Sequence, residues 1–156
     1  MKTNIGIKEK DTKVVAEILN QLLADENVLY TKVRNAHWNV VGPDFHAQHI
    51  FFEEIYSALA ELIDEVAERI RAIGHYAVGS MKEFLDFTRL SETKYKKNDS
   101  QGFIKELLSD FESLIIHIRE DLKRADEHND AGTEDFLVGI LAQHEKTAWM
   151  LRAHLS

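Results

Sequence analysis

The sequence lacks cysteine and has one proline and seven glycines among its 156 residues. Without cysteine it can form no disulfide, thiolate metal site or cysteine nucleophile. The scarcity of proline and glycine permits long, uninterrupted helices. No apolar stretch approaches the roughly 20 residues of a membrane-spanning helix, and the opening MKTNIGIKEKD lacks the apolar centre of a signal peptide. We therefore expect a soluble, cytoplasmic protein without a membrane segment.

Positive charge is also scarce. The sequence has 19 Lys and Arg against 27 Asp and Glu, a formal net charge of −8. This balance repels nucleic-acid phosphates and attracts cations. Two short basic stretches stand out, one near the start and one at residues 94–97: Lys2, Lys8, Lys10, Lys94, Lys96 and Lys97. We expect weak or absent DNA binding.

Apolar residues recur at helical spacing in four long segments. The first covers about residues 11–40. The second, about residues 44–73, has a seam of about four heptads, and Gly74 supplies a stop signal. The residues of this seam are Phe45, His49, Phe52, Tyr56, Leu59, Ile63, Val66, Ile70 and Ile73. Asp99 or Ser100 can cap the third helix, and Thr133 can cap the fourth.

Residues 75–98 form a long connection with one short helical segment at residues 81–87. The corner between the first two helices and the loop before the fourth are short. One long crossover in a four-helix bundle is the ferritin-like topology. We therefore predict an all-α, ferritin-like four-helix bundle with a short extra helix between helices two and three. Residues 1–10 are expected to be a tail, and residues 11–156 a single domain.

Two polar pairs lie on one stripe of the second helix. His49 and Glu53 are four residues apart, as are Asp64 and Glu68, so the members of each pair are neighbours across one turn. Such pairs are common on helix surfaces, but imidazole with carboxylates also suits iron, zinc or manganese. The 11 residues from Glu53 to Asp64 correspond to ~17 Å along the axis. One metal site therefore cannot use both pairs of a single helix.

A second copy of the helix can bring the two pairs together. In an antiparallel pair of identical helices, residues whose numbers have one fixed sum lie opposite each other. His49 with Glu68 and Glu53 with Asp64 have the same sum. A two-fold dimer crossing near residues 58 and 59 would therefore form two complete sites. The small Ser57 and Ala60 near this crossing permit close approach.

His37 lies at the end of the first helix, just before the Gly42-Pro43 corner. The corner can fold it back beside His49. Each site would then contain His37, His49 and Glu53 from one chain with Asp64 and Glu68 from the other. The alternative role for His37 is a capping or core histidine. His46 is off the seam and is a weaker ligand candidate.

The usual di-iron centre inside such a bundle requires Glu-x-x-His on two helices. No histidine of this sequence has a glutamate three residues before it. The interior is therefore expected to be closed and apolar, which places any metal at a subunit interface.

The stretch HWNVVGPDFHAQH, followed by FFEE, LIDEVAERI and AIG, resembles the Dps family of mini-ferritins. The similarity extends from about residue 12 to the C-terminus. It implies hollow dodecamers that oxidise Fe(II), preferably with hydrogen peroxide, between two-fold related subunits and store ferric mineral against oxidative stress. It also implies His37, His49, Glu53, Asp64 and Glu68 as ligands of iron, for which zinc or other divalent cations can substitute. The family commonly has Asp at position 53.

Residues 126–135, DEHNDAGTED, are acidic. Taken alone they indicate a solvated turn with acids at a helix start. The resemblance implies that Asp126, Asp130 and Asp135 line three-fold pores through which cations enter the shell. Glu54, Glu61 and Glu65 either face the cavity or form a solvated face. Two other functions remain open: a DNA-compacting architectural protein, and a helical oligomer without metal chemistry.

Overall fold

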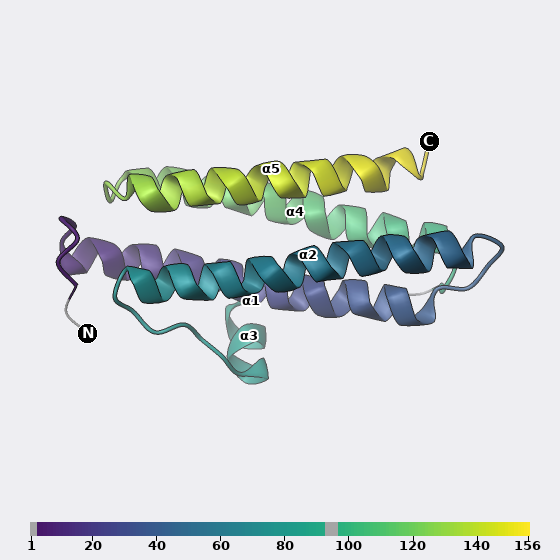
Figure 1. The fold of residues 1–156 in the computed structure, drawn as a ribbon, viewed down its shortest axis with the longest axis horizontal. Coiled ribbons are helices and arrows are strands. Elements are labelled where there is room, and N and C mark those ends of the chain that lie inside the picture. The colour runs from purple at the N-terminus through teal and green to yellow at the C-terminus, as the bar shows by residue number, and fades with distance from the viewer. Residues whose placement is uncertain (1–2, 93–96) are drawn as a thin grey trace.

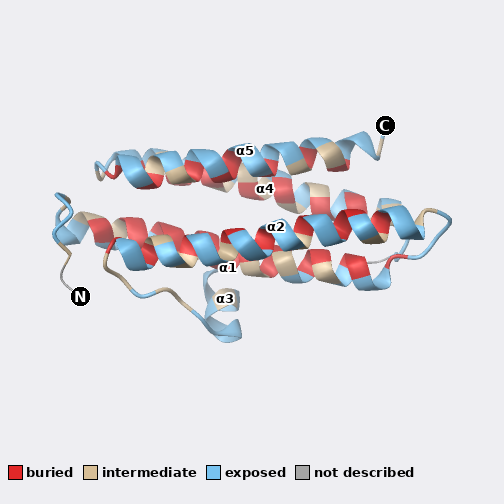
Figure 2. Ribbon diagram, viewed as in Figure 1, coloured by how far each residue is buried: buried red, intermediate tan, exposed pale blue. Residues whose placement is uncertain are grey.

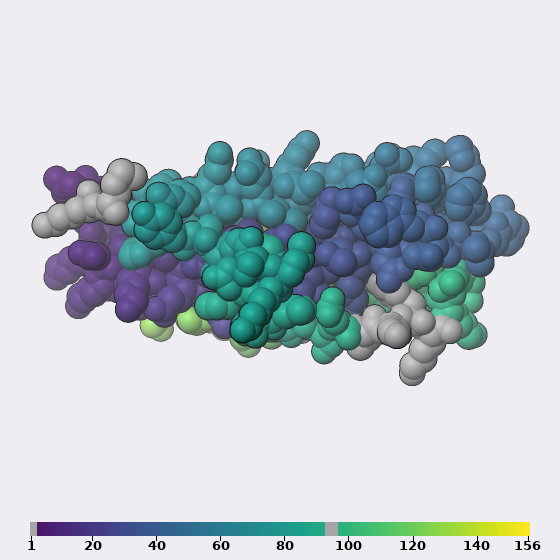
Figure 3. Space-filling model, turned by 90° about the horizontal axis from the view of Figure 1, so that it is seen from below, coloured from purple at the N-terminus to yellow at the C-terminus, as the bar shows by residue number. Residues whose placement is uncertain are grey.

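The computed structural model describes residues 3–92 and 97–156. Within these ranges the regular secondary structure is helical: α1 Glu9–Asn39, α2 Phe45–Ala72, α3 Met81–Phe87, α4 Ser100–Asp126 and α5 Ala131–Ala153. The pairs α1–α2 and α4–α5 form two layers of a four-helix bundle (Figure 1). The connection after α2 returns along the bundle and carries α3, which packs against α1 (Figure 3). The predicted all-α architecture, with one crossover and a short extra helix, is confirmed.

The corner between α1 and α2 is tight because of its glycine and proline. Gly42 has φ +136°, which residues with a Cβ rarely adopt. At the other end of α2, Gly74 has φ +97°. Its N–H donates to the carbonyl of Arg71, and the N–H of His75 donates to that of Ile70. This is the Schellman arrangement, and the stop predicted at Gly74 is confirmed.

The other helix starts agree only in part with the sequence predictions. The Asp99 carboxylate accepts from the Gly102 N–H and caps α4 as expected. The predicted cap at Thr133 is wrong, because Asp130 caps α5 and accepts the Thr133 N–H. Thr133 is buried in the first turn instead. α1 begins at Glu9, inside the segment assigned to the tail.

Apolar side chains of the four long helices fill the space between the two layers, and buried stripes alternate with exposed ones along each helix (Figure 2). The largest fully buried side chains include Phe52, Phe103 and Phe111. Each such side chain contributes about 1.5–3 kcal/mol by leaving water. None of the described helices combines the length and apolarity that crossing a bilayer requires.

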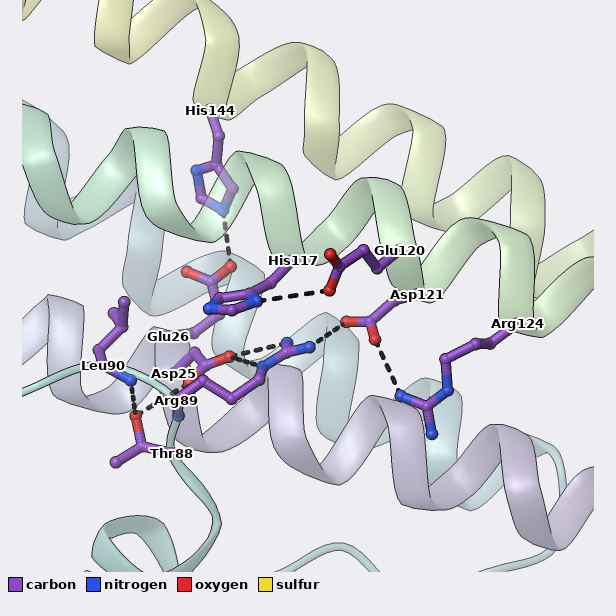
Figure 4. A network of polar contacts seen from close by, with 10 residues as sticks. All are labelled: Asp25, Glu26, Thr88, Arg89, Leu90, His117, Glu120, Asp121, Arg124 and His144. Atoms are coloured by element: carbon purple, nitrogen blue, oxygen red, sulfur yellow. Dashed lines mark hydrogen bonds and ion pairs between the residues drawn. The ribbon is translucent and has the colours of Figure 1, made fainter.

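The prediction of a wholly apolar interior is wrong, because charged groups lie inside the bundle (Figure 4). Arg89, just after α3, forms ion pairs of 2.8 Å with Asp25 of α1 and with Asp121 of α4. Burial raises the pKa of Asp121, although the neighbouring Arg89 and Arg124 favour its charged form. This network attaches the end of the crossover to two core helices.

A second buried pair joins α1 to α5. His144 Nε2 lies 2.6 Å from Glu26 Oε1, and both side chains are at most 3% exposed. The ring of Phe111 packs edge-on against His144 at 5.4 Å. The sequence did contain a signal for this pair: Glu26 falls at core spacing between Leu22 and Leu29, as does His144 between Ile140 and Ala148.

Candidate metal centre

The last turn of α1 and the beginning of α2 bring His37 and His49 into contact. His37 Nδ1 lies 2.8 Å from the carbonyl oxygen of His49, and His49 Nδ1 lies 2.9 Å from that of His37. The two rings stack with centroids 3.7 Å apart. The predicted folding of His37 beside His49 is therefore confirmed.

These reciprocal contacts select one tautomer of each neutral ring. A carbonyl oxygen can only accept a hydrogen bond, so each Nδ1 must carry a proton. In the neutral imidazole, Nε2 then keeps its lone pair and is the atom available to a metal. Metal-ligating histidines are typically held in this way, with the other ring nitrogen bonded to a backbone carbonyl or carboxylate. The corner thus provides two oriented nitrogen donors before any ion arrives.

The three predicted carboxylates lie on the surface of α2. Glu53 is one turn after His49, and Asp64 and Glu68 follow further along; all three are exposed. In the part of the chain that the structure describes, no hydrogen bond or ion pair engages Asp64 or Glu68. Their oxygens are free for a ligand from outside the chain.

One chain does not assemble all five predicted ligands. α2 is a single continuous helix, so Glu53 and Asp64 are ~17 Å apart along its axis. Among residues 3–92 and 97–156, no three His, Asp or Glu side chains are grouped closely enough to hold a metal ion. Ser57 and Ala60, midway between the two pairs, are exposed and leave that part of the helix open to close approach. His46 is exposed and points to no partner among the described residues.

Comparison with known proteins agrees with this arrangement of helices. A family model described as a ferritin-like domain matches residues 16–156. DNA protection during starvation protein 2 of Bacillus anthracis is 42% identical over 144 residues, which cover 92% of this chain and 98% of that protein. The chain belongs to the Dps family.

Other Dps proteins extend the likeness to the fold. The DNA protection during starvation protein of Helicobacter pylori is 39% identical over 90% of this chain and 97% of its own length. The crystal structure of a Vibrio cholerae Dps protein superposes with a TM-score of 0.93 at 34% identity, covering 100% of this chain and 98% of that one. That protein is described as a member of the ferritin-like diiron-carboxylate superfamily.

The acidic loop of this Dps-family chain contains two kinds of aspartate. Asp126 and Asp135 are exposed, whereas Asp130 is 2% exposed. Asp130 Oδ1 lies 2.8 Å from Arg69 Nη2, and Thr133 donates its hydroxyl to Asp130 Oδ2. Asp130 is therefore engaged in capping α5 and in tying it to α2. The sequence analysis did not identify Arg69 as the partner of Asp130, although Arg69 directly follows the candidate ligand Glu68.

The basic stretches add little positive surface. Lys8, Lys10 and Lys97 are exposed. Lys2, Lys94 and Lys96 lie outside the described residues. Lys8 and Lys10 flank the acidic Glu9 and Asp11 at the start of α1, which dilutes the charge there.

Proposed function

We propose that this Dps-family protein oxidises Fe(II) at sites shared by two subunits and stores the ferric product in a hollow shell. The observation that carries the proposal is the reciprocal hydrogen bonding of His37 and His49, which leaves both Nε2 atoms without a partner among the described residues. The relatives named for DNA protection during starvation support a protective role, and we infer the same role for this chain.

Each site would combine complementary halves. One subunit supplies His37, His49 and Glu53, and its two-fold partner supplies Asp64 and Glu68. The support is the shared stripe on α2, its exposed carboxylates and the exposed small residues at its centre. Three carboxylates would neutralise most of the charge of the iron and favour the harder ferric state. Zinc or other divalent cations would compete for the same donors.

The chemistry requires only electron transfer from iron. Two ferrous ions give one electron each, and hydrogen peroxide with two protons accepts both to form two water molecules. Because peroxide is reduced by two electrons, hydroxyl radical is largely avoided. The side chains bind and orient Fe(II) as substrate, and no nucleophile is needed.

The proposal also includes the assembly of the shell and the entry of iron, and the family relationship supports both. A dodecamer would enclose the mineral, and the exposed Asp126 and Asp135 would draw ferrous ions to three-fold pores. Asp130 would act there through the shape of the loop, since its carboxylate is buried and paired. DNA compaction is the less favoured function, because the net charge of −8 opposes phosphate binding.

The decisive experiment removes the partner's half of the site. In Asp64→Ala/Glu68→Ala, the peroxide-driven oxidation of anaerobically loaded Fe(II) should slow by at least about tenfold, since disturbing even the residues behind metal ligands costs 10–100-fold. Sedimentation should show unchanged assembly.

A matched control is Glu61→Ala/Glu65→Ala, which removes two exposed charges from the same helix that are not among the proposed ligands. Its initial rate should equal that of the unaltered protein. Wild-type oxidation kinetics in Asp64→Ala/Glu68→Ala would show that the ligand assignment is wrong.

A further inference from the structure

Tyr56 contacts two of the proposed metal ligands of its own chain. Its hydroxyl donates to Glu53 Oε1 at 3.5 Å, which is a weak hydrogen bond, longer than the usual range of about 2.5–3.0 Å between two oxygens. Its ring meets the ring of His37 edge-on, with centroids 5.1 Å apart and planes at 78°. Tyr56 is thus the residue that joins the carboxylate side of the half-site to its imidazole side.

The ring of Tyr56 is itself held in place. Tyr30 of α1 packs against it edge-on at 6.0 Å. The Arg34 guanidinium lies 5.5 Å from the centroids of both tyrosine rings and donates a 2.9 Å hydrogen bond to the Tyr30 hydroxyl. Cation–π and edge-to-face contacts depend on the orientation of the rings, so they restrict the rotation of the Tyr56 ring. The direction of the Tyr56 hydroxyl is therefore set by α1.

Glu53 requires such a support more than the two histidines do. Its carboxylate stands on a flexible chain at an exposed position, and fixing a glutamate side chain costs rotamer entropy. Ligating carboxylates are commonly hydrogen-bonded by a neighbouring residue that orients them. A hydroxyl on Oε1 leaves Oε2 to face the ion.

We propose that Tyr56 is a positioning residue of the metal site, which orients Glu53 through its hydroxyl and supports His37 through its ring. This inference rests on the proposed function, because it assumes that Glu53 and His37 bind the metal. It assigns to Tyr56 a share of the metal affinity without direct contact to the ion.

The test uses Co(II) as a probe on the assembled protein under anaerobic conditions. Tyr56→Phe keeps the ring and removes only the hydroxyl. We expect a roughly three- to tenfold weaker Co(II) affinity, the range for one lost hydrogen bond, and altered visible absorption bands of the bound ion. A change in these bands reports ligand geometry, which a purely structural role would leave unaltered.

Tyr76→Phe is the matched control, since it removes a hydroxyl from a tyrosine that is 79% exposed, lies against Arg71 and contacts none of the proposed ligands. Its Co(II) affinity and spectrum should match those of the unaltered protein. Glu53→Asp gives a double-mutant cycle: the shorter side chain places its carboxylate away from the Tyr56 hydroxyl, so adding Tyr56→Phe should cost no further affinity.

The outcomes separate the two proposals. Saturable Co(II) binding that is identical in the unaltered protein and in Tyr56→Phe would overturn the role of Tyr56 while leaving the metal site intact. An additive effect in the double variant would also overturn it. Absence of saturable Co(II) binding in the unaltered protein would overturn the metal site and the role of Tyr56 together.

Discussion

Two regions of the molecule combine carboxylates with basic or imidazole groups, and they differ in what surrounds those groups. Inside the bundle, Asp25 and Glu26 are fully buried and are paired with Arg89 and His144 of the same chain. On the surface of α2, Asp64 and its neighbour Glu68 are exposed and unpaired among the described residues. Similar carboxylates are therefore bound within the fold in one region and accessible to a ligand in the other.

The difference shows how to tell a structural cluster from a binding site. A buried carboxylate must find its partner within the fold, because an unpaired buried charge costs several kcal/mol. An exposed carboxylate remains solvated without a partner and can exchange water for a metal ion. The histidines follow the same division. His144 Nε2 contacts Glu26, whereas Nε2 of His37 and of His49 has no partner in the part of the chain that the structure describes.

The largest effect on stability is expected from Arg89→Met. Removal of the cation leaves Asp25 and Asp121 buried without it, so the free energy of unfolding should fall by about 3–5 kcal/mol. Urea denaturation measures this loss. Co(II) affinity of the assembled protein should be unaffected, since Arg89 contacts no proposed ligand.

Arg152→Met is the control for that substitution. Arg152 pairs with Glu112, but both side chains are about half exposed, and exposed pairs contribute about 0–1 kcal/mol. Equal losses in the two variants would contradict the distinction between the interior network and surface charge.

An intermediate effect is expected from His144→Leu. Glu26 would keep its buried position but lose its partner, which should cost about 1–3 kcal/mol in urea denaturation. Glu26→Leu/His144→Leu removes both polar groups, so the double variant should be more stable than His144→Leu alone. A double variant that is less stable than His144→Leu would show that the pair itself holds the two helices together.

The smallest effect on stability is expected at Glu83, whose carboxylate accepts hydrogen bonds but is exposed to solvent. The Ser80 hydroxyl, followed by the Gly79 N–H, lowers the pKa of Glu83 below its usual value. The pKa of Glu83 is therefore lower in the folded protein than in the unfolded chain, where it is about 4.3. The ionised carboxylate stabilises the start of α3 above that unfolded value, and this stabilisation is lost as the pH falls through the folded-state pKa. Hydrogen exchange of α3 amides, corrected for intrinsic rates, should therefore show fraying in acid.

Ser80→Ala tests that origin, since it removes the hydroxyl of the capping box. Its α3 amides should show at neutral pH part of the fraying that the unaltered protein shows in acid. Unchanged protection of α3 at both pH values would contradict the assigned cause.

The sequence was most informative where periodicity or a special backbone residue leaves one physical solution. The heptad seam of α2 and the stop at Gly74 are local patterns. The structure confirms the stop, and it buries most of the seam from Phe52 to Ile73, but Phe45 at the start of the seam is exposed. The contact of His37 with His49 was also predicted, because the short Gly42-Pro43 corner can fold the end of α1 back beside the start of α2. Their roles as metal ligands, with those of Glu53, Asp64 and Glu68, stay predictions.

Sequence reasoning failed where a choice depended on distant residues. Thr133 and Asp130 are both good helix caps, and the choice of Asp130 is reinforced by Arg69, 61 residues earlier in the chain. The apolar interior was predicted because no Glu-x-x-His motif was present. That argument could not reveal Glu26 with His144, which are 118 residues apart.

The helices, their order and the single stripe of candidate ligands could be predicted from the sequence, because hydrophobic periodicity and turn residues act over a few neighbouring positions. Only the tertiary structure decided which polar groups are buried in pairs and which remain free. Helical spacing can mark Glu26 and His144 as core positions, but the partner that each one meets depends on how distant helices pack together.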